Sequence, residues 1–284
     1  MSISSELGAM RQAETPTGGI IYRARGDGPP LVFLHGIVAN GDLWRKVVPQ
    51  LADDFHCITP DWPLGSHRLP LEGDPDLTLP GLAKIVDDFL AAQGLDDVTL
   101  VANDTGGAIA QTVVGRHPDR IGRLVLTPCD AFENFLPPIL RHLQVFGRTG
   151  PGLRVLAETL RLGAIQRLPI AFGRLTHRPI DPEIMRSYTA PLRESAGVRR
   201  DFARLVRGIS TRHTLDAAKR LPGYDRPVLI AWALEDRLFP LAHAHRLAAL
   251  FPDARVETIE DSLAFVPEDQ PGPLARLVRE FAAS

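Results

Sequence analysis

The stretch Val98-Thr99-Leu100-Val101-Ala102-Asn103-Asp104-Thr105-Gly106-Gly107 decides the fold of this chain. Its first four residues form an apolar run with the length of a buried strand, and the residues after it are typical of a helix. A strand, a tight turn of small residues and a helix, in this order, hold the central side chain of the turn over the end of a parallel sheet. That central residue is Asp104.

Asp104 has two interpretations. A turn of this kind is a nucleophile elbow, and a carboxylate in it can displace a leaving group from an alkyl carbon, giving an ester that water later cleaves. Alternatively, Asp104 caps the following helix, where a carboxylate accepts from free N–H groups and meets the positive end of the helix dipole. The stretch alone leaves both open.

The composition is that of a globular protein. The chain has 284 residues, of which 44% are hydrophobic and 23% charged, enough for one large domain with an insertion. A net charge of −2 lacks the basic excess that is typical of nucleic-acid-binding proteins. No stretch of the sequence reaches the roughly 20 apolar residues that span a bilayer. The start lacks a signal-peptide pattern, and two cysteines indicate a reducing compartment. We expect a cytoplasmic protein that binds a small molecule but neither nucleic acid nor membrane; a homodimer is left open.

Strands and helices are predicted to alternate outside one long segment. The predicted strands are 19–25, 31–35, 55–59, 98–101, 123–127, 228–233 and 255–259, and the predicted helices are 43–51, 76–93, 107–117, 241–251 and 273–283. Strict alternation indicates an α/β fold with a mostly parallel sheet flanked by helices. In the long segment between the predicted strands 123–127 and 228–233, prolines interrupt short helical patterns, and Arg and Lys outnumber Asp and Glu. We expect a core domain of 1–131 and 223–284 and an inserted helical cap domain of 132–222.

The motifs resemble those of the α/β-hydrolase fold. Leu31 to Gly36 ends in a His-Gly pair, Asp61 to Gly65 follows the next strand, and Trp232 to Asp236 follows a later one. With the Asp104 elbow, their order and spacing are similar to the branch that contains haloalkane dehalogenases and epoxide hydrolases, whose elbow nucleophile is Asp. The resemblance covers nearly the whole chain outside the cap. It implies an enzyme, a probable hydrolase, that acts on a small electrophilic organic substrate without a cofactor.

The resemblance also implies roles for residues around the elbow. Asp104 would be the nucleophile, and the backbone N–H groups of Ile37 and Thr105 would form the oxyanion or leaving-group site. Backbone donors suit this role because the fold fixes them before charge develops. His35 lies in the same loop and is expected beside the pocket, and we interpret it as a residue that hydrogen-bonds the backbone.

The main departure from the family is its missing catalytic histidine. In the family this residue follows the last strand in a segment Asp-x-x-His-Phe, whereas the segment 261–265 has Ala264 in its place. Asp236 matches the acid that normally orients the histidine, and Asp130 is a rival for that role. Without a base the alkyl ester would form and stall. We expect Ala264 to line the pocket near Asp236, and His67 is the best-placed substitute base.

The substrate class and the type of reaction stay open. Thr105 stands where dehalogenases of this branch usually carry Trp, and epoxide hydrolases use cap tyrosines, for which Tyr188 is the candidate in the pocket, although a core role suits it equally. One alternative is a non-hydrolytic lyase, isomerase or cyclase with Asp104 as general acid or base, and another is a ligand-binding pseudoenzyme. His243 and His245 point to different faces of a predicted helix, so no metal site is expected.

Overall fold

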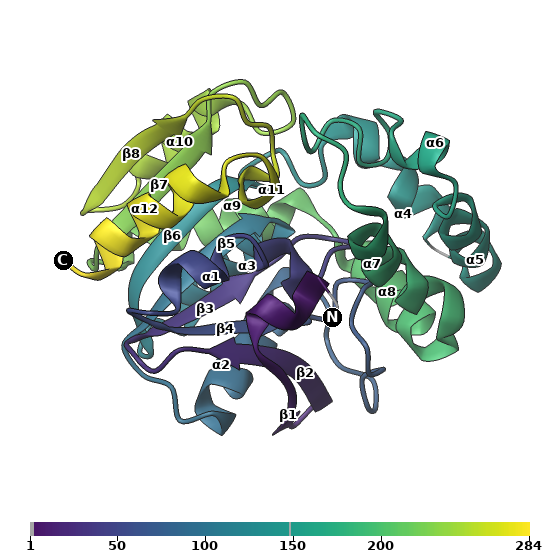
Figure 1. The fold of residues 1–284 in the computed structure, drawn as a ribbon, viewed down its shortest axis with the longest axis horizontal. Helices are drawn as coiled ribbons and strands as arrows, with labels where there is room; N and C mark the ends of the chain where they lie inside the picture. The colour runs from purple at the N-terminus through teal and green to yellow at the C-terminus, as the bar shows by residue number, and fades with distance from the viewer. Residues whose placement is uncertain (1–2, 148) are drawn as a thin grey trace.

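The computed structural model describes residues 3–147 and 149–284. One eight-stranded sheet with the strand order β1-β2-β4-β3-β5-β6-β7-β8 forms its centre (Figure 1). The strands are β1 (Ala9–Thr15), β2 (Gly18–Arg25), β3 (Pro30–Leu34), β4 (His56–Pro60), β5 (Val98–Asp104), β6 (Ile121–Cys129), β7 (Val228–Ala233) and β8 (Ala254–Ile259). β3 to β8 pair in parallel, and β1 and β2 add an antiparallel edge. The predicted α/β fold with a mostly parallel sheet is confirmed.

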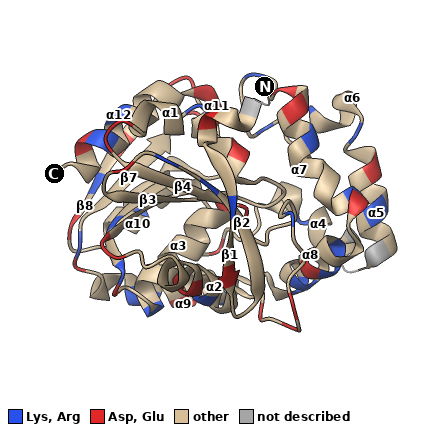
Figure 2. Cartoon of the chain, turned by 60° about the horizontal axis from the view of Figure 1, so that its bottom comes forward, with Lys and Arg blue, Asp and Glu red and all other residues tan. Residues whose placement is uncertain are grey.

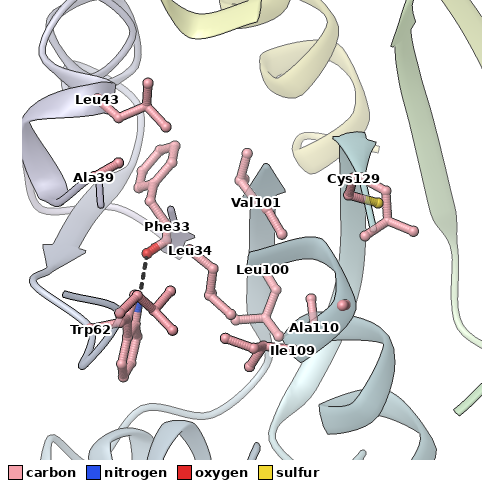
Figure 3. Close-up of a cluster of buried hydrophobic side chains, with 14 of the residues drawn as sticks. Phe33, Leu34, Ala39, Leu43, Trp62, Leu100, Val101, Ile109, Ala110 and Cys129 are labelled. Atoms are coloured by element: carbon pink, nitrogen blue, oxygen red, sulfur yellow. Dashed lines mark hydrogen bonds between the residues drawn. The ribbon is translucent and has the colours of Figure 1, made fainter. Parts of the chain in front are cut away.

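The central strands are buried on both faces, which explains their continuous apolar sequence. Leu34 of β3 and Leu100 of β5 lie on the same face of the sheet as Ile109 of the next helix, whereas Phe33 lies on the other face, toward Leu43 (Figure 3). Trp62 closes this cluster, and its indole N–H donates a hydrogen bond of 2.9 Å to the carbonyl oxygen of Phe33. Each large side chain buried here contributes about 1.5–3 kcal/mol to folding. The central strands are therefore held firmly in the core.

Helices cover the sheet in two groups. They are α1 (Val48–Leu51), α2 (Leu79–Ala92), α3 (Thr105–Arg116), α9 (Thr211–Arg220), α10 (Leu241–Ala248), α11 (Val266–Asp269) and α12 (Pro271–Ala282). α3 contacts both α2 and α9, whereas α12 contacts α1 and α11, and α10 packs on β7 and β8. The sheet is therefore flanked by helices, as the alternation predicts.

Two elements differ from the sequence prediction. The single helix expected over 43–51 is a 3-10 helix (Gly41–Trp44) followed by α1, because Pro49 can begin a helix but cannot continue one. β1 is not predicted at all. Most of its side chains are exposed, so it lacks the apolar alternation by which strands are recognised.

The segment between β6 and β7 is helical and lies beyond the carboxyl ends of the strands (Figure 1). It contains the 3-10 helix η3 (Pro138–Leu140), α4 (His142–Phe146), α5 (Gly150–Thr159), α6 (Gly163–Gln166), α7 (Pro182–Glu194) and α8 (Ala196–Gly208). α5 contacts α4, α7 and α8. Figure 2 shows basic residues on α5, α7 and α8.

The boundary of the cap is the one point at which this segment differs from expectation. The range 132–222 includes α9, which packs against α3 and α2 of the core. We keep the division into core and cap as a proposal, with the end of the cap near residue 209.

Candidate active site

Asp104 stands at the junction of β5 and α3 in a strained backbone conformation. Its φ is 56° and its ψ is −133°, a region that non-glycine residues rarely adopt. The turn needs small neighbours, because a Cβ at Gly106 would lie 2.5 Å from the carbonyl oxygen of Leu34. A Cβ at Gly36 would lie 2.2 Å from Oδ1 of Asp104. These contacts leave one narrow place for the carboxylate, and Asp104 as a whole is 7% exposed.

Backbone donors hold the Asp104 carboxylate. Oδ1 accepts a hydrogen bond of 2.7 Å from the N–H of Thr105, so Asp104 is the N-cap of α3. Burial raises the pKa of Asp104, while the N–H groups of Thr105 and Ile37 oppose that rise because they favour the charged form. The two donors implied by the family resemblance therefore lie at this carboxylate.

Asp130 lies directly beside Asp104, after β6. Its N–H donates to the carbonyl oxygen of Asp104 at 3.4 Å, and its Oδ2 accepts a hydrogen bond of 2.8 Å from the hydroxyl of Thr105. Oδ1 of Asp130 is buried and has no hydrogen-bond partner among the described residues. Burial, and then the negative charge of Asp104, raise the pKa of Asp130 well above its usual range.

A cavity of about 280 Å³ lies between this edge of the sheet and the cap. Its core side includes Ile37, Asp104 and Asp130. The cap side is mostly aliphatic and aromatic and includes Leu140, Leu143, Leu156, Leu160, Ile165, Phe172 and Leu175. The arrangement suits a small apolar molecule held over two carboxyl groups.

The cavity also includes a histidine that the sequence did not distinguish from the other cap histidines. Nδ1 of His142 lies 3.0 Å from the carbonyl oxygen of Ile139. A carbonyl only accepts, so Nδ1 carries a proton there, and in the neutral ring Nε2 is the acceptor. No local sequence signal could have revealed His142, because its position depends on how α4 packs over the sheet.

Asp236 and Ala264 lie outside the cavity lining in the described structure. Oδ1 of Asp236 accepts a 2.8 Å hydrogen bond from the N–H of Leu238, and burial raises the pKa of Asp236 to about 7. Ala264 is completely buried, and its carbonyl accepts a 2.7 Å hydrogen bond from the side-chain amide of Asn103. The expectation that Ala264 lines the pocket is therefore wrong, because the chain around it is sealed against the core.

His67 lies away from the cavity as well. Its Nε2 is 3.4 Å from Oδ2 of Asp201 on α8, and the ring is buried between its loop and that helix. Oδ2 of Asp201 also accepts a hydrogen bond of 2.8 Å from the N–H of Leu71. His67 connects a core loop to the cap and is not among the described residues that line the cavity, so its position does not support the predicted role of substitute base.

His35 and Tyr188 are structural in this geometry, and neither is among the described residues that line the cavity. Nδ1 of His35 donates to the carbonyl of Gly36 at 2.9 Å, and Nε2 accepts from the N–H of Trp62 at 2.9 Å. Burial lowers the pKa of His35 to about 4, which keeps the ring neutral. Tyr188 is fully buried behind Phe172, with ring centroids 6.4 Å apart. The expectation that His35 and Tyr188 lie in the pocket is therefore wrong for the described cavity lining.

Within residues 3–147 and 149–284, no group of three or more His, Cys, Asp or Glu side chains is arranged to hold a metal ion. None of the helices described in the structure has the length and apolar character needed to cross a bilayer.

Comparison with known proteins supports the fold over nearly the whole chain. A family model described as alpha/beta hydrolase fold matches residues 29–271. Haloalkane dehalogenase 2 of Mycobacterium tuberculosis is 28% identical over 275 residues, covering 95% of this chain and 93% of that protein. Cis-3-alkyl-4-alkyloxetan-2-one decarboxylase of Xanthomonas campestris is 29% identical over 275 residues, covering 90% and 88%. The solved structure of epoxide hydrolase CorEH superposes with a TM-score of 0.79 at 21% identity, covering 97% and 98%.

Proposed function

Because this chain belongs to the α/β-hydrolase fold family, we propose that it is a hydrolase in which Asp104 attacks an electrophilic carbon of a small apolar substrate. The observation that carries the proposal is the Asp104 carboxylate itself, fixed at the elbow, bound by backbone N–H groups and lining the cavity. Haloalkane- or epoxide-type hydrolysis fits this geometry, and relatives with both kinds of name support it.

The first step is a displacement. The carboxylate of Asp104 attacks the carbon, the bond to the leaving group breaks, and Asp104 becomes an alkyl ester. An apolar cavity strengthens this attack, because the carboxylate meets the substrate without a shell of water.

The second step returns the enzyme to its starting state. Water adds to the ester carbonyl, and the N–H groups of Ile37 and Thr105, already at this carboxyl group, stabilise the negative charge that develops on its oxygen. A base must take a proton from the water. With Ala264 in place of the family histidine, Asp130 and His142 are the titratable side chains besides Asp104 among the described residues that line the cavity.

Mass spectrometry of the intact protein tests the nucleophile. A reactive alkyl halide that enters the cavity should add one alkyl group per chain, and peptide mapping should place it on Asp104. Asp104→Asn should take up none. An adduct at another residue, or one that forms equally in Asp104→Asn, would refute covalent catalysis by Asp104.

A second candidate is a non-hydrolytic reaction at the same nucleophile. The decarboxylase relative is named for an oxetan-2-one, a strained ring ester, and a reaction that consumes no water needs no water-activating histidine. Supplying a small dialkyl oxetan-2-one and measuring carbon dioxide and alkene distinguishes the two candidates. Hydroxy acid as the sole product would support hydrolysis.

The location and assembly of the protein stay proposals too. Cys57 and Cys129 are both free and buried, which supports the cytoplasm as a reducing location. A homodimer stays a prediction that sedimentation of the purified chain would test.

A further inference from the structure

The structure assigns a second catalytic group to the cavity, Asp130, which acts as acid in the first step and as base in the second. This inference rests on the proposed function and names its substrate class. We propose that the substrates turned over are strained cyclic ethers, whose leaving oxygen takes the proton of Asp130. Simple haloalkanes alkylate Asp104 and then stall.

The position of Asp130 gives it access to both steps. Asp104 and Asp130 line the same cavity, and the hydroxyl of Thr105 lies between their carboxyl groups. That hydroxyl lies 2.8 Å from Oδ2 of Asp130, so it links the two carboxyl groups. Oδ1 of Asp130 is buried and has no hydrogen-bond partner among the described residues, so no donor favours the charged form at that oxygen.

The closeness of Asp104 and Asp130 determines which of the two carboxyl groups holds a proton before the reaction begins. Two carboxyl groups this close in a buried site do not both ionise. The hydroxyl of Thr105 interacts with both carboxyl groups, but Asp104 also has two backbone donors that favour its charged form, whereas Asp130 faces the charge of Asp104. Asp104 is therefore the nucleophile and Asp130 holds the proton.

The proton balance closes over one cycle. As Asp104 attacks the carbon, the carbon–oxygen bond of the ring breaks and the alkoxide takes the proton of Asp130, leaving a carboxylate. That carboxylate takes a proton from water as the hydroxide adds to the ester carbonyl of Asp104. When the tetrahedral intermediate collapses, the departing alkoxide takes the carboxyl proton of Asp104. The products are a diol, ionised Asp104 and protonated Asp130, the same exchange of acid and base roles that retaining glycosidases use.

A halide leaving group interrupts this cycle. Halide departs as a stable anion and needs no proton, so Asp130 keeps its own. The ester of Asp104 then forms beside a carboxylic acid that cannot act as a base. Ring-opening substrates generate the base they need, and haloalkanes do not.

The test compares terminal epoxyhexane with terminal bromohexane, two probes that share one carbon skeleton. The natural chain should convert epoxyhexane over many turnovers, and it should release one equivalent of bromide per chain and then stop. Asp130→Asn should lower epoxide turnover by at least ~10²-fold, because both proton transfers are lost. It should still release one equivalent of bromide, which shows that the variant is folded and that Asp104 remains reactive.

The pH profile provides a second readout. Ester formation from epoxyhexane should fall at high pH, as Asp130 loses its proton, and at low pH, as Asp104 gains one. Ester formation from bromohexane should show only the fall at low pH. A purely structural role of Asp130 would give both substrates the same profile.

Three results would overturn the inference. Sustained turnover of bromohexane by the natural chain would show that another base is present. Full epoxide turnover in Asp130→Asn, together with its loss in His142→Gln, would assign the proton transfers to His142. Failure of both probes to form any ester on Asp104 would refute the proposed function itself, and the role of Asp130 with it.

Discussion

Two acidic regions at the carboxyl ends of the strands differ in what they face. At the β5–β6 region, Asp104 and Asp130 line the cavity and share the hydroxyl of Thr105. At the β7–β8 region, Asp236 and Ala264 are buried outside the cavity lining, and Oδ2 of Asp236 has no hydrogen-bond partner among the described residues. Burial does not distinguish the two regions, because Asp236 is 8% exposed, Asp104 7% and Asp130 0%. They differ in that Asp104 and Asp130 line the cavity and Asp236 does not. Because a catalytic group must reach the substrate, position in the cavity lining favours the β5–β6 region as the site of the chemistry.

The largest expected effect comes from Asp104→Asn. An amide of the same size cannot form the ester, so turnover of an epoxide should fall on the order of 10⁴-fold or more. Steady-state product formation measures this. Substantial remaining activity would mean that the β5–β6 region does not supply the nucleophile.

Gly36→Ala should have the next largest effect. The added Cβ would lie 2.2 Å from Oδ1 of Asp104, and the strained elbow gives the short side chain little freedom to move aside. A displacement of the nucleophile by about 1 Å costs roughly 10²-fold in turnover. Gly223→Ala, where no atom lies within 4 Å of the added carbon, is the matched control and should retain activity. Equal turnover in both variants would contradict the tight fit at the elbow.

Asp236→Asn should change turnover only a few-fold but should alter the pH dependence of stability. The pKa of Asp236 is raised to about 7, so between its ordinary value and 7 the folded chain holds a proton that the unfolded chain has lost. The free energy of unfolding therefore falls as pH rises through this window. Asparagine should remove about 2 kcal/mol of that fall between pH 5.5 and 8, measured by urea unfolding. Loss of turnover comparable to Asp104→Asn would make the β7–β8 region catalytic.

Ala264→His should leave the lifetime of the Asp104 ester unchanged. The site is fully buried, so the larger ring should cost about 1–3 kcal/mol of stability through overpacking. Ala264→Leu adds a similar volume without a base and is the matched control. Faster ester hydrolysis in the histidine variant than in the leucine variant would show that this closed region can reach the ester.

The fold and the elbow were predictable because their signals are local. The apolar run of β5 and the glycines after Asp104 specify a strand, a sharp turn and a helix within one stretch of sequence. β1 was not predictable from its own residues, because its exposed side chains give no pattern and its pairing with β2 holds it in place.

The arrangement around Asp104 was less predictable, since it depends on contacts between distant segments. In the sequence, Asp130 lies further from Asp104 than the family resemblance implies for the acid that orients the histidine. An irregularity in the β5–β6 register pairs Asp104 with Cys129 and so brings Asp130 alongside. The cavity position of His142 and the burial of Ala264 depend on the packing of the cap and of the last loop, for which the sequence has no local signal.

A single turnover in water labelled with heavy oxygen tests covalent catalysis by Asp104 most directly. Hydrolysis of the ester at its carbonyl leaves the solvent oxygen on Asp104, so we expect label in the peptide that contains Asp104 and none in the first product molecule. Label in the product, with an unlabelled Asp104 peptide, would show that water attacks the substrate directly and would contradict covalent catalysis at the elbow.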